Sequence, residues 1–153
     1  GITAGIGGLA YAGIPVTHCD TNQAVTFLTG HDQTGLVPDA INWEAVANGS
    51  PVIVMYMAMK HIDGIAQSLI KAGRRADEPL AFVCNAATGA QQVLESTIGS
   101  AAADATAAGI EPPAIVVVGE VVRLRAGLDW LGLSQGRVLE ADPLRRQPVR
   151  DAG

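Results

Sequence analysis

Short apolar runs alternate along this chain with segments in which apolar residues recur at helical spacing. Three runs, Pro51–Tyr56, Leu80–Cys84 and Ala114–Val118, are almost continuously apolar, which is typical of strands buried on both faces. A shorter β-branched run, Ala24–Thr29, predicts another strand. Residues 91–98 instead alternate between apolar and polar side chains, and this pattern indicates an exposed or edge strand.

Helices are expected between these strands because suitable capping residues lie at their ends. Asn42 and Ser100 are favourable N-cap residues, and Gly13, Gly73 and Gly109 follow helix-periodic segments as stops. The expected helices cover residues 2–13, 42–47, 62–70 and 100–108. Strands alternating with helices predict an α/β fold with a mixed, mostly parallel sheet flanked by helices, in which the alternating strand is antiparallel.

Composition narrows the class of partner. The 153 residues are 48% hydrophobic and 16% charged, which is typical of one globular domain. The net charge of −5 argues against nucleic acid and against anionic lipid. The longest apolar stretch, Pro51–Met59, is shorter than the ~20 residues that a membrane span needs. Cys19 and Cys84 are expected to be free thiols of a cytoplasmic protein.

Residue types alone suggest no nucleophile and no metal centre. His18, His31 and His61 lack metal-ligand spacing, and no C-x-x-C pair occurs. Residues 18–20 are His, Cys and Asp, but neighbours on an extended segment point to opposite faces, so we expect a poor joint site. The charges between residues 120 and 125 predict a solvated cluster.

A glycine pattern near the start invites a nucleotide hypothesis. Gly5, Gly7 and Ala10 fit G-x-G-x-x-A, but that motif requires a strand directly before it to aim the helix at a pyrophosphate. Only four residues precede Gly5, so dinucleotide binding is disfavoured. The chain also starts at Gly1 rather than Met, directly on an apolar segment, and we expect further chain upstream.

Several phrases, taken together and in order, resemble the S-adenosylmethionine-dependent tetrapyrrole methylases. They are GITA at 1–4, YAGIPVTH at 11–18, TGH at 29–31, YM at 56–57, CNAAT at 84–88 and PAIVVVGEVVRLR at 113–125. The last phrase, followed by Leu128 and Trp130, is especially similar to the uroporphyrinogen-III C-methyltransferase branch of that family. The similarity extends from the first residue to Trp130.

The resemblance implies a two-domain α/β enzyme that binds its cofactor between the domains. The family's first-domain motifs, a G-x-G-P-G-D loop and a G-G-D loop, do not occur here. The chain is therefore expected to supply the C-terminal half and to be inert alone, and no catalytic residue is assigned to it. The implied division is a linker helix over 1–13, a C-terminal tetrapyrrole methylase domain over 14–131 and a polar, mobile tail over 132–153.

The implied reaction is methyl transfer from S-adenosylmethionine to C-2 and C-7 of uroporphyrinogen III. The products would be precorrin-2, which serves sirohaem or cobalamin biosynthesis, and S-adenosylhomocysteine. A homodimer is implied as well. Two alternatives stay open: another methylase of corrin or diphthamide synthesis, and a non-catalytic ligand-binding or dimerisation module.

Four positions match the family's cofactor contacts. Thr3 and Ala4 match a pair at a helix start, where a hydroxyl and free amides can meet the methionine carboxylate. Met57 would border the adenosine, and the main chain of Ala86 would hold the adenine. Each has an ordinary alternative: a helix cap for Thr3, a core methionine for Met57 and a loop alanine for Ala86.

The substrate that the resemblance implies carries eight carboxylates, so a net-acidic chain must present local cations. The candidates are His31, Lys60, Arg123 and Arg125. Cys19 stands where the family usually has Arg, so one positive charge is lost at that position.

Overall fold

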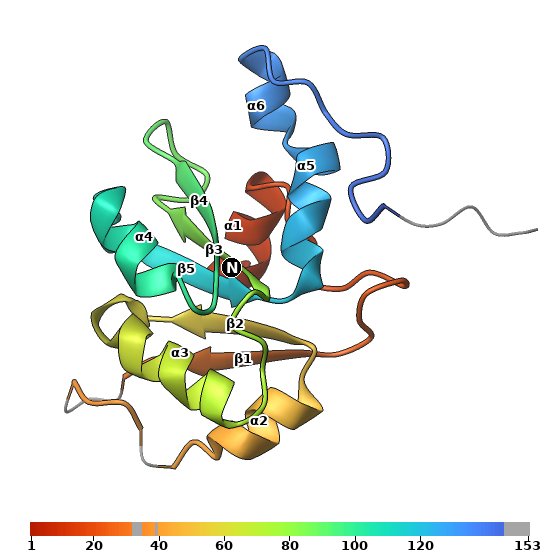
Figure 1. Ribbon diagram of the computed structural model, residues 1–153. Helices are drawn as coiled ribbons and strands as arrows, with labels where there is room; N and C mark the ends of the chain where they lie inside the picture. The colour runs from red at the N-terminus through yellow and green to blue at the C-terminus, as the bar shows by residue number, and fades with distance from the viewer. Residues whose placement is uncertain (32–34, 39, 146–153) are drawn as a thin grey trace, which may run out of the picture.

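The computed structural model describes residues 1–31, 35–38 and 40–145, and it contains one five-stranded sheet in the order β1-β2-β5-β3-β4 (Figure 1). The strands are β1 Val25–Thr29, β2 Val52–Tyr56, β3 Pro79–Cys84, β4 Gln92–Thr97 and β5 Ala114–Val118. All five coincide with the expected runs to within one or two residues. The alternating strand is β4, which forms an edge and pairs antiparallel with β3, as predicted.

The mixed α/β class is confirmed, but the balance of strand directions differs from expectation. β1 and β2 are parallel, whereas the pairs β2–β5, β5–β3 and β3–β4 are antiparallel. The expectation of a mostly parallel sheet was therefore wrong for the described residues. The reason is that helices on both faces make a strand apolar throughout, whatever the direction of its neighbours.

Six α-helices and two 3₁₀ turns connect the described strands. They are α1 Ala4–Tyr11, α2 Trp43–Gly49, η1 Met59–His61, α3 Ile62–Lys71, α4 Ala101–Ala107, η2 Glu120–Leu124, α5 Arg125–Leu128 and α6 Trp130–Ser134. The Asn42 cap is confirmed, because its side chain accepts a 2.9 Å hydrogen bond from the Ala45 amide. Ser100 occupies the cap position of α4 without a side-chain cap bond, since its backbone is already helical (φ −103°, ψ −7°).

Alternate side chains of the sheet divide the core into two layers. On one face α2, α3 and α4 cover a cluster that includes Met55, Phe82 and Val116. On the other face α1 and η2 cover a cluster that includes Leu9, Val54 and Val117 (Figure 1). The first helix is therefore packed into the same body as the sheet, and it carries Thr3 and Ala4 to one end of the strands.

The polar segment expected to begin at residue 132 starts inside α6. Beyond that helix, Arg137 donates a 2.7 Å hydrogen bond to the Asp129 carboxylate. Residues 146–153 of the expected tail lie outside the described residues. Among the described residues, no helix has both the length and the apolar character that a membrane crossing requires.

Candidate functional site

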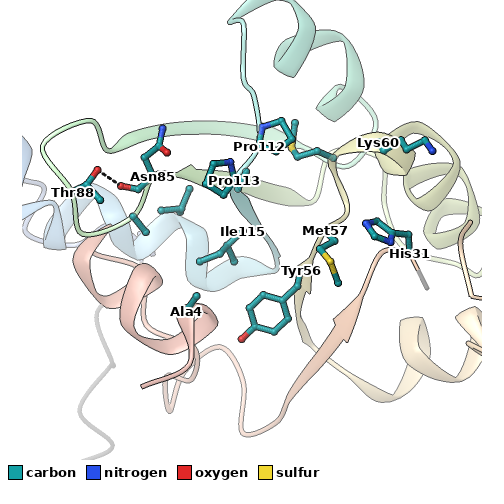
Figure 2. A pocket seen from close by; sticks show the side chains of 14 residues that line it. Ala4, His31, Tyr56, Met57, Lys60, Asn85, Thr88, Pro112, Pro113 and Ile115 are labelled. Atoms are coloured by element: carbon teal, nitrogen blue, oxygen red, sulfur yellow. Dashed lines mark hydrogen bonds between the residues drawn. The ribbon is translucent and has the colours of Figure 1, made fainter. Parts of the chain in front are cut away.

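An open cavity of about 570 Å³ lies at one end of the sheet (Figure 2). β1, β2 and β3 reach it with their carboxyl ends, whereas the antiparallel β5 reaches it with its amino end. Its lining residues come from α1 and from the loops at these strand ends: Ala4, His31, Tyr56, Met57, Met59, Lys60, Val83, Asn85, Ala86, Thr88, Pro112, Pro113, Ala114 and Ile115. Strand ends are common places for binding sites, because a rigid sheet positions the loops that follow it.

The positions that the sequence singled out meet at this cavity. Ala4, Met57 and Ala86 all line it, although they come from three separate stretches of the chain. Thr3 is not a lining residue, but its hydroxyl oxygen lies 2.6 Å from that of Tyr56, whose side chain does line the cavity. The fold thus gathers four residues from three separate stretches of the chain: the start of α1, the end of β2 and the loop after β3.

Thr3 is the N-cap residue of α1, but its hydroxyl bonds to Tyr56, so the side-chain cap bond that the alternative expects is not made. Three amides of the first turn of α1 are already engaged. Gly5 N–H donates to the Tyr56 hydroxyl (3.0 Å), and the amides of Ile6 and Gly7 donate to the Thr3 carbonyl (3.0 Å each). The expectation of free amides there is therefore wrong for these three residues, and the polar side chains at this corner are two coupled hydroxyls.

The backbone around the cavity adopts an uncommon conformation. Met57, Asn85 and Ala87 have φ values of +52°, +46° and +60°, which lie in the left-handed region that normally favours glycine. This conformation costs about 1–2 kcal/mol at Met57 and at Ala87, whereas asparagine adopts it more readily, and such positions cluster at functional sites. The Met57 side chain is also 53% exposed, so the alternative of a core methionine is wrong.

Hydrogen bonds hold the exposed loop after β3 in place. Asn85 N–H donates to the Pro113 carbonyl (3.2 Å), and the Thr88 hydroxyl donates to the Asn85 carbonyl (2.7 Å; Figure 2). Ala87 N–H donates to the Gln91 side chain (2.8 Å). Tyr56, Asn85 and Thr88 were not predicted as site residues, although all three belong to the phrases that carry the family resemblance.

Small residues around the cavity allow close packing. A Cβ added to Gly8 would lie 2.7 Å from Ile115 Cδ1 and 2.8 Å from Ala86 Cβ. A Cβ on Gly5 would lie 2.5 Å from the Tyr56 hydroxyl oxygen. Gly5 and Gly8 therefore let α1 approach the sheet, and Gly5, the first glycine of the G-x-G-x-x-A pattern, has a packing role that needs no pyrophosphate.

The four candidate cations do not lie together. His31 and Lys60 line the cavity, at the side away from Asn85 and Thr88 (Figure 2). Arg123 is exposed and pairs with Glu120 at 2.6 Å. Arg123 and Arg125 are not among the lining residues, and neither is placed to meet a ligand bound there.

The expectation that the charges between residues 120 and 125 form a solvated cluster is wrong for Arg125. Its side chain is only 12% exposed, and it pairs with Glu95 at 2.6 Å and with Asp129 at 2.8 Å. Burial by itself would raise the pKa of Asp129. Hydrogen bonds from the Gly132 amide and from Arg137, together with the charges of both arginines, outweigh burial and hold that pKa below its usual value.

Comparison with known proteins places the cavity in context. The family model for tetrapyrrole (corrin/porphyrin) methylases matches residues 1–102. A uroporphyrinogen-III C-methyltransferase of Sinorhizobium sp. is 70% identical over 151 residues, which are 99% of this chain and 54% of that protein. A sirohaem synthase of Thiobacillus denitrificans is 39% identical over 94% of this chain and 30% of its own length. The chain thus spans about half, or less, of these relatives.

Solved structures agree on the fold. A Thermus thermophilus uroporphyrin-III C-methyl transferase, complexed with S-adenyl homocysteine, matches with a TM-score of 0.66 and 29% identity. That match covers 81% of this chain and 52% of the other. A cobalt precorrin-4 methyltransferase matches in fold, with a TM-score of 0.71 and 20% identity. From the family model and these relatives, the chain belongs to the tetrapyrrole (corrin/porphyrin) methylases.

Proposed function

We propose that this chain forms one wall of the S-adenosylmethionine site of an enzyme that methylates uroporphyrinogen III at C-2 and C-7. The observation that carries the proposal is the meeting of Ala4, Met57 and Ala86, with Thr3 behind Tyr56, at one cavity. The similarity to a uroporphyrinogen-III C-methyltransferase at 70% identity supports the same substrate. Because the chain spans 54% of that relative, the remaining wall would come from the other half of the enzyme.

The cavity has properties that suit this cofactor. Its volume of about 570 Å³ lies within the ~300–1,000 Å³ typical of small-molecule sites. Most lining groups are apolar, which suits a flat purine, and the polar groups are few. Ala4 and Ala86 present no bulk, so a ligand can approach the main chain closely there.

When bound, S-adenosylmethionine supplies an electrophilic methyl group on a sulfonium, so the protein mainly has to orient two ligands and exclude water. The hydroxyls of Thr3 and Tyr56 would orient the polar end of the cofactor. The half-exposed Met57 side chain would cover the cofactor and keep water away. Together these residues position and desolvate, and none of them has to act as an acid or a base.

His31 and Lys60 would attract the substrate's carboxylates to the same cavity. Lys60 is exposed and lines the cavity together with His31. An ammonium group at the edge of the cavity attracts a carboxylate, and this attraction would strengthen as the bound ligands exclude water from the cavity. We therefore assign these two of the four candidate cations to substrate binding.

The test is calorimetric titration of S-adenosylhomocysteine into the complete enzyme. Met57→Asp should weaken binding at least 100-fold, because it sets an anion and poorer packing beside the ligand. Val138→Asp is the control, since Val138 is also an exposed apolar residue (86%) and does not line the cavity. Wild-type affinity in Met57→Asp would refute the proposed site.

Ala86→Phe should raise the KM for the cofactor with little change in melting temperature.

We also propose that the chain alone is catalytically inert. The described cavity is open, and one wall forfeits most of the roughly 7–11 kcal/mol that positioning can contribute. The purified chain should therefore give no precorrin-2 absorbance from uroporphyrinogen III and S-adenosylmethionine. Turnover near that of a complete enzyme would contradict a divided site.

The complete enzyme is proposed to be a cytoplasmic homodimer. The exposed apolar side chains of Leu128, Trp130 and Leu133 near the end of the described chain support self-association. Sedimentation of the complete enzyme would test this, and a monomer at micromolar concentration would exclude it.

A further inference from the structure

A second cluster of ligand-type side chains lies in the loop between α1 and β1. His18, Cys19 and Asp20 offer an imidazole nitrogen, a sulfur and a carboxylate oxygen that all lie within 4.8 Å of one another. The prediction of an extended segment with side chains on opposite faces is wrong. The segment is a tight turn closed by an antiparallel bridge between His18 and Asn22, so three successive side chains converge.

A buried asparagine holds this turn. The Asn22 residue is 2% exposed, and its side-chain amide donates to the carbonyls of Val16 (2.9 Å) and Ala24 (3.0 Å). Its side-chain oxygen accepts from the Thr21 hydroxyl (2.8 Å). The backbone N–H of Asn22 also donates to the His18 carbonyl (2.9 Å). The backbone that carries the three donor groups is therefore preorganised.

The donor spacing is close to that of a metal site. Cys19 Sγ lies 3.6 Å from one Asp20 carboxylate oxygen, and His18 Nδ1 lies 3.8 Å from the other. Metal–ligand bonds of about 2.0–2.3 Å in tetrahedral geometry put neighbouring ligands roughly 3.3–3.8 Å apart. A separation of at most 4.8 Å between any two donors then needs only side-chain adjustment of about 1 Å or less.

We propose that His18, Cys19 and Asp20 form a surface site for a borderline-soft divalent cation of the Zn²⁺ class. Thiolate and imidazole ligands disfavour Mg²⁺ and Ca²⁺, which prefer oxygen. On binding, the Cys19 thiol releases its proton to solvent, and thiolate plus carboxylate balance the two charges of the metal. The cation takes the place of the hydrogen-bond contacts that Cys19 and His18 make with Asp20 (3.6 Å and 3.2 Å). The partly exposed site leaves a fourth position for water.

Co²⁺ is the probe for the test, because a cobalt–thiolate bond absorbs in the near ultraviolet. The reduced chain should bind one equivalent with a charge-transfer band, and Zn²⁺ should abolish the band by displacement. Cys19→Ser should remove the band, and His18→Ala should weaken binding at least tenfold. Cys84→Ala is the matched control, because Cys84 is the chain's other thiol and is buried. It should keep the band and the affinity.

Absence of the band in the wild-type chain would overturn the proposal. So would a band that persists in Cys19→Ser, or one lost in Cys84→Ala, since either would place the thiolate elsewhere. Melting curves of each variant without metal distinguish loss of ligand from loss of fold, because the exposed Cys19→Ser should leave the apo melting temperature unchanged.

Discussion

Two regions of this molecule use charge in opposite ways. The corner formed by β4, α5 and α6 holds a network of Arg125, Asp129, Arg137 and Glu95, in which Asp129 is 5% exposed. The cavity at the strand ends is mostly apolar, with backbone strain at Met57 and only a few polar groups. The charged corner joins elements of the fold, whereas the charge-poor cavity carries the proposed chemistry.

The contrast shows that charged residues are a poor guide to function in this fold. Ions removed from water must be paired and hydrogen-bonded. The charged groups of the corner therefore pair with one another and do not bind a ligand at the cavity. The methyl transfer that we propose demands alignment more than acid–base chemistry, so main chain and small residues would suffice at the cavity. The predictions below test this division from both sides.

The largest effect is expected from Asp129→Ala. It removes the partner that both Arg125 and Arg137 share and leaves Arg125, 12% exposed, short of one counter-charge. Breaking such a buried pair costs about 3 kcal/mol, which urea unfolding would measure. Asp77→Ala is the control, because Asp77 pairs with Arg75 at the surface and should show no measurable change. Cofactor affinity of the folded variant should stay at the wild-type value. A loss of affinity together with the loss of stability would contradict the division between a structural corner and a binding cavity.

Gly8→Ala should cost about 1–3 kcal/mol and also impair cofactor binding. The added Cβ would overpack Ile115 and Ala86, and both line the cavity. Gly7→Ala is the control in the same helix, since its Cβ meets only the side chain of Ile2, which is 82% exposed and can move. That control should be neutral or stabilising by up to about 1 kcal/mol. Equal effects of the two variants in thermal melts and titrations would contradict the packing role of Gly8.

Met57→Gly should separate backbone strain from side-chain contact. At φ +52° a glycine relieves about 1 kcal/mol of strain, so this variant should be more stable than Met57→Ala by that amount. Both variants lack the side chain that we propose covers the cofactor, and both should bind it more weakly than wild type. A Met57→Gly variant that is less stable than Met57→Ala would show that the left-handed backbone is not strained.

The smallest effect is expected on the pH dependence of the unfolding free energy in acid. The depressed pKa of Asp129 means that its ionised form contributes stability above the unfolded-state pKa of about 3.9. That contribution is lost as pH falls from about 4 through the lower folded-state pKa. The unfolding free energy of wild type should therefore fall more steeply than that of Asp129→Asn over this window. Identical slopes in the two proteins would remove Asp129 from the acid response.

Local patterns predicted much of the fold. The apolar runs located β2, β3 and β5, the alternating run located the edge strand β4, and Asn42 capped α2 as expected. These features follow from burial, side-chain period and hydrogen bonds within a few residues, all of which leave a local trace in sequence. Ser100 did not follow its pattern, because its backbone had already turned helical.

The candidate site was predicted by resemblance rather than by residue chemistry. Thr3, Ala4, Met57 and Ala86 look ordinary one at a time, and the cavity exists because α1 and the strand ends meet. Met57 has a positive φ without being a glycine, so the sequence contains no sign of this backbone conformation. The proposed cofactor roles of these four residues remain predictions.

By itself, the sequence determined the positions of the strands, the faces that the helices bury and the family to which the chain belongs. Only the tertiary structure decided the direction in which β5 runs, the burial of Arg125 and the convergence of His18, Cys19 and Asp20 in one turn. The physical reason is the separation in sequence of the groups that interact. Periodicity and capping are set by neighbours along the chain, whereas strand direction, ion pairing and the meeting of loops depend on groups brought together across it.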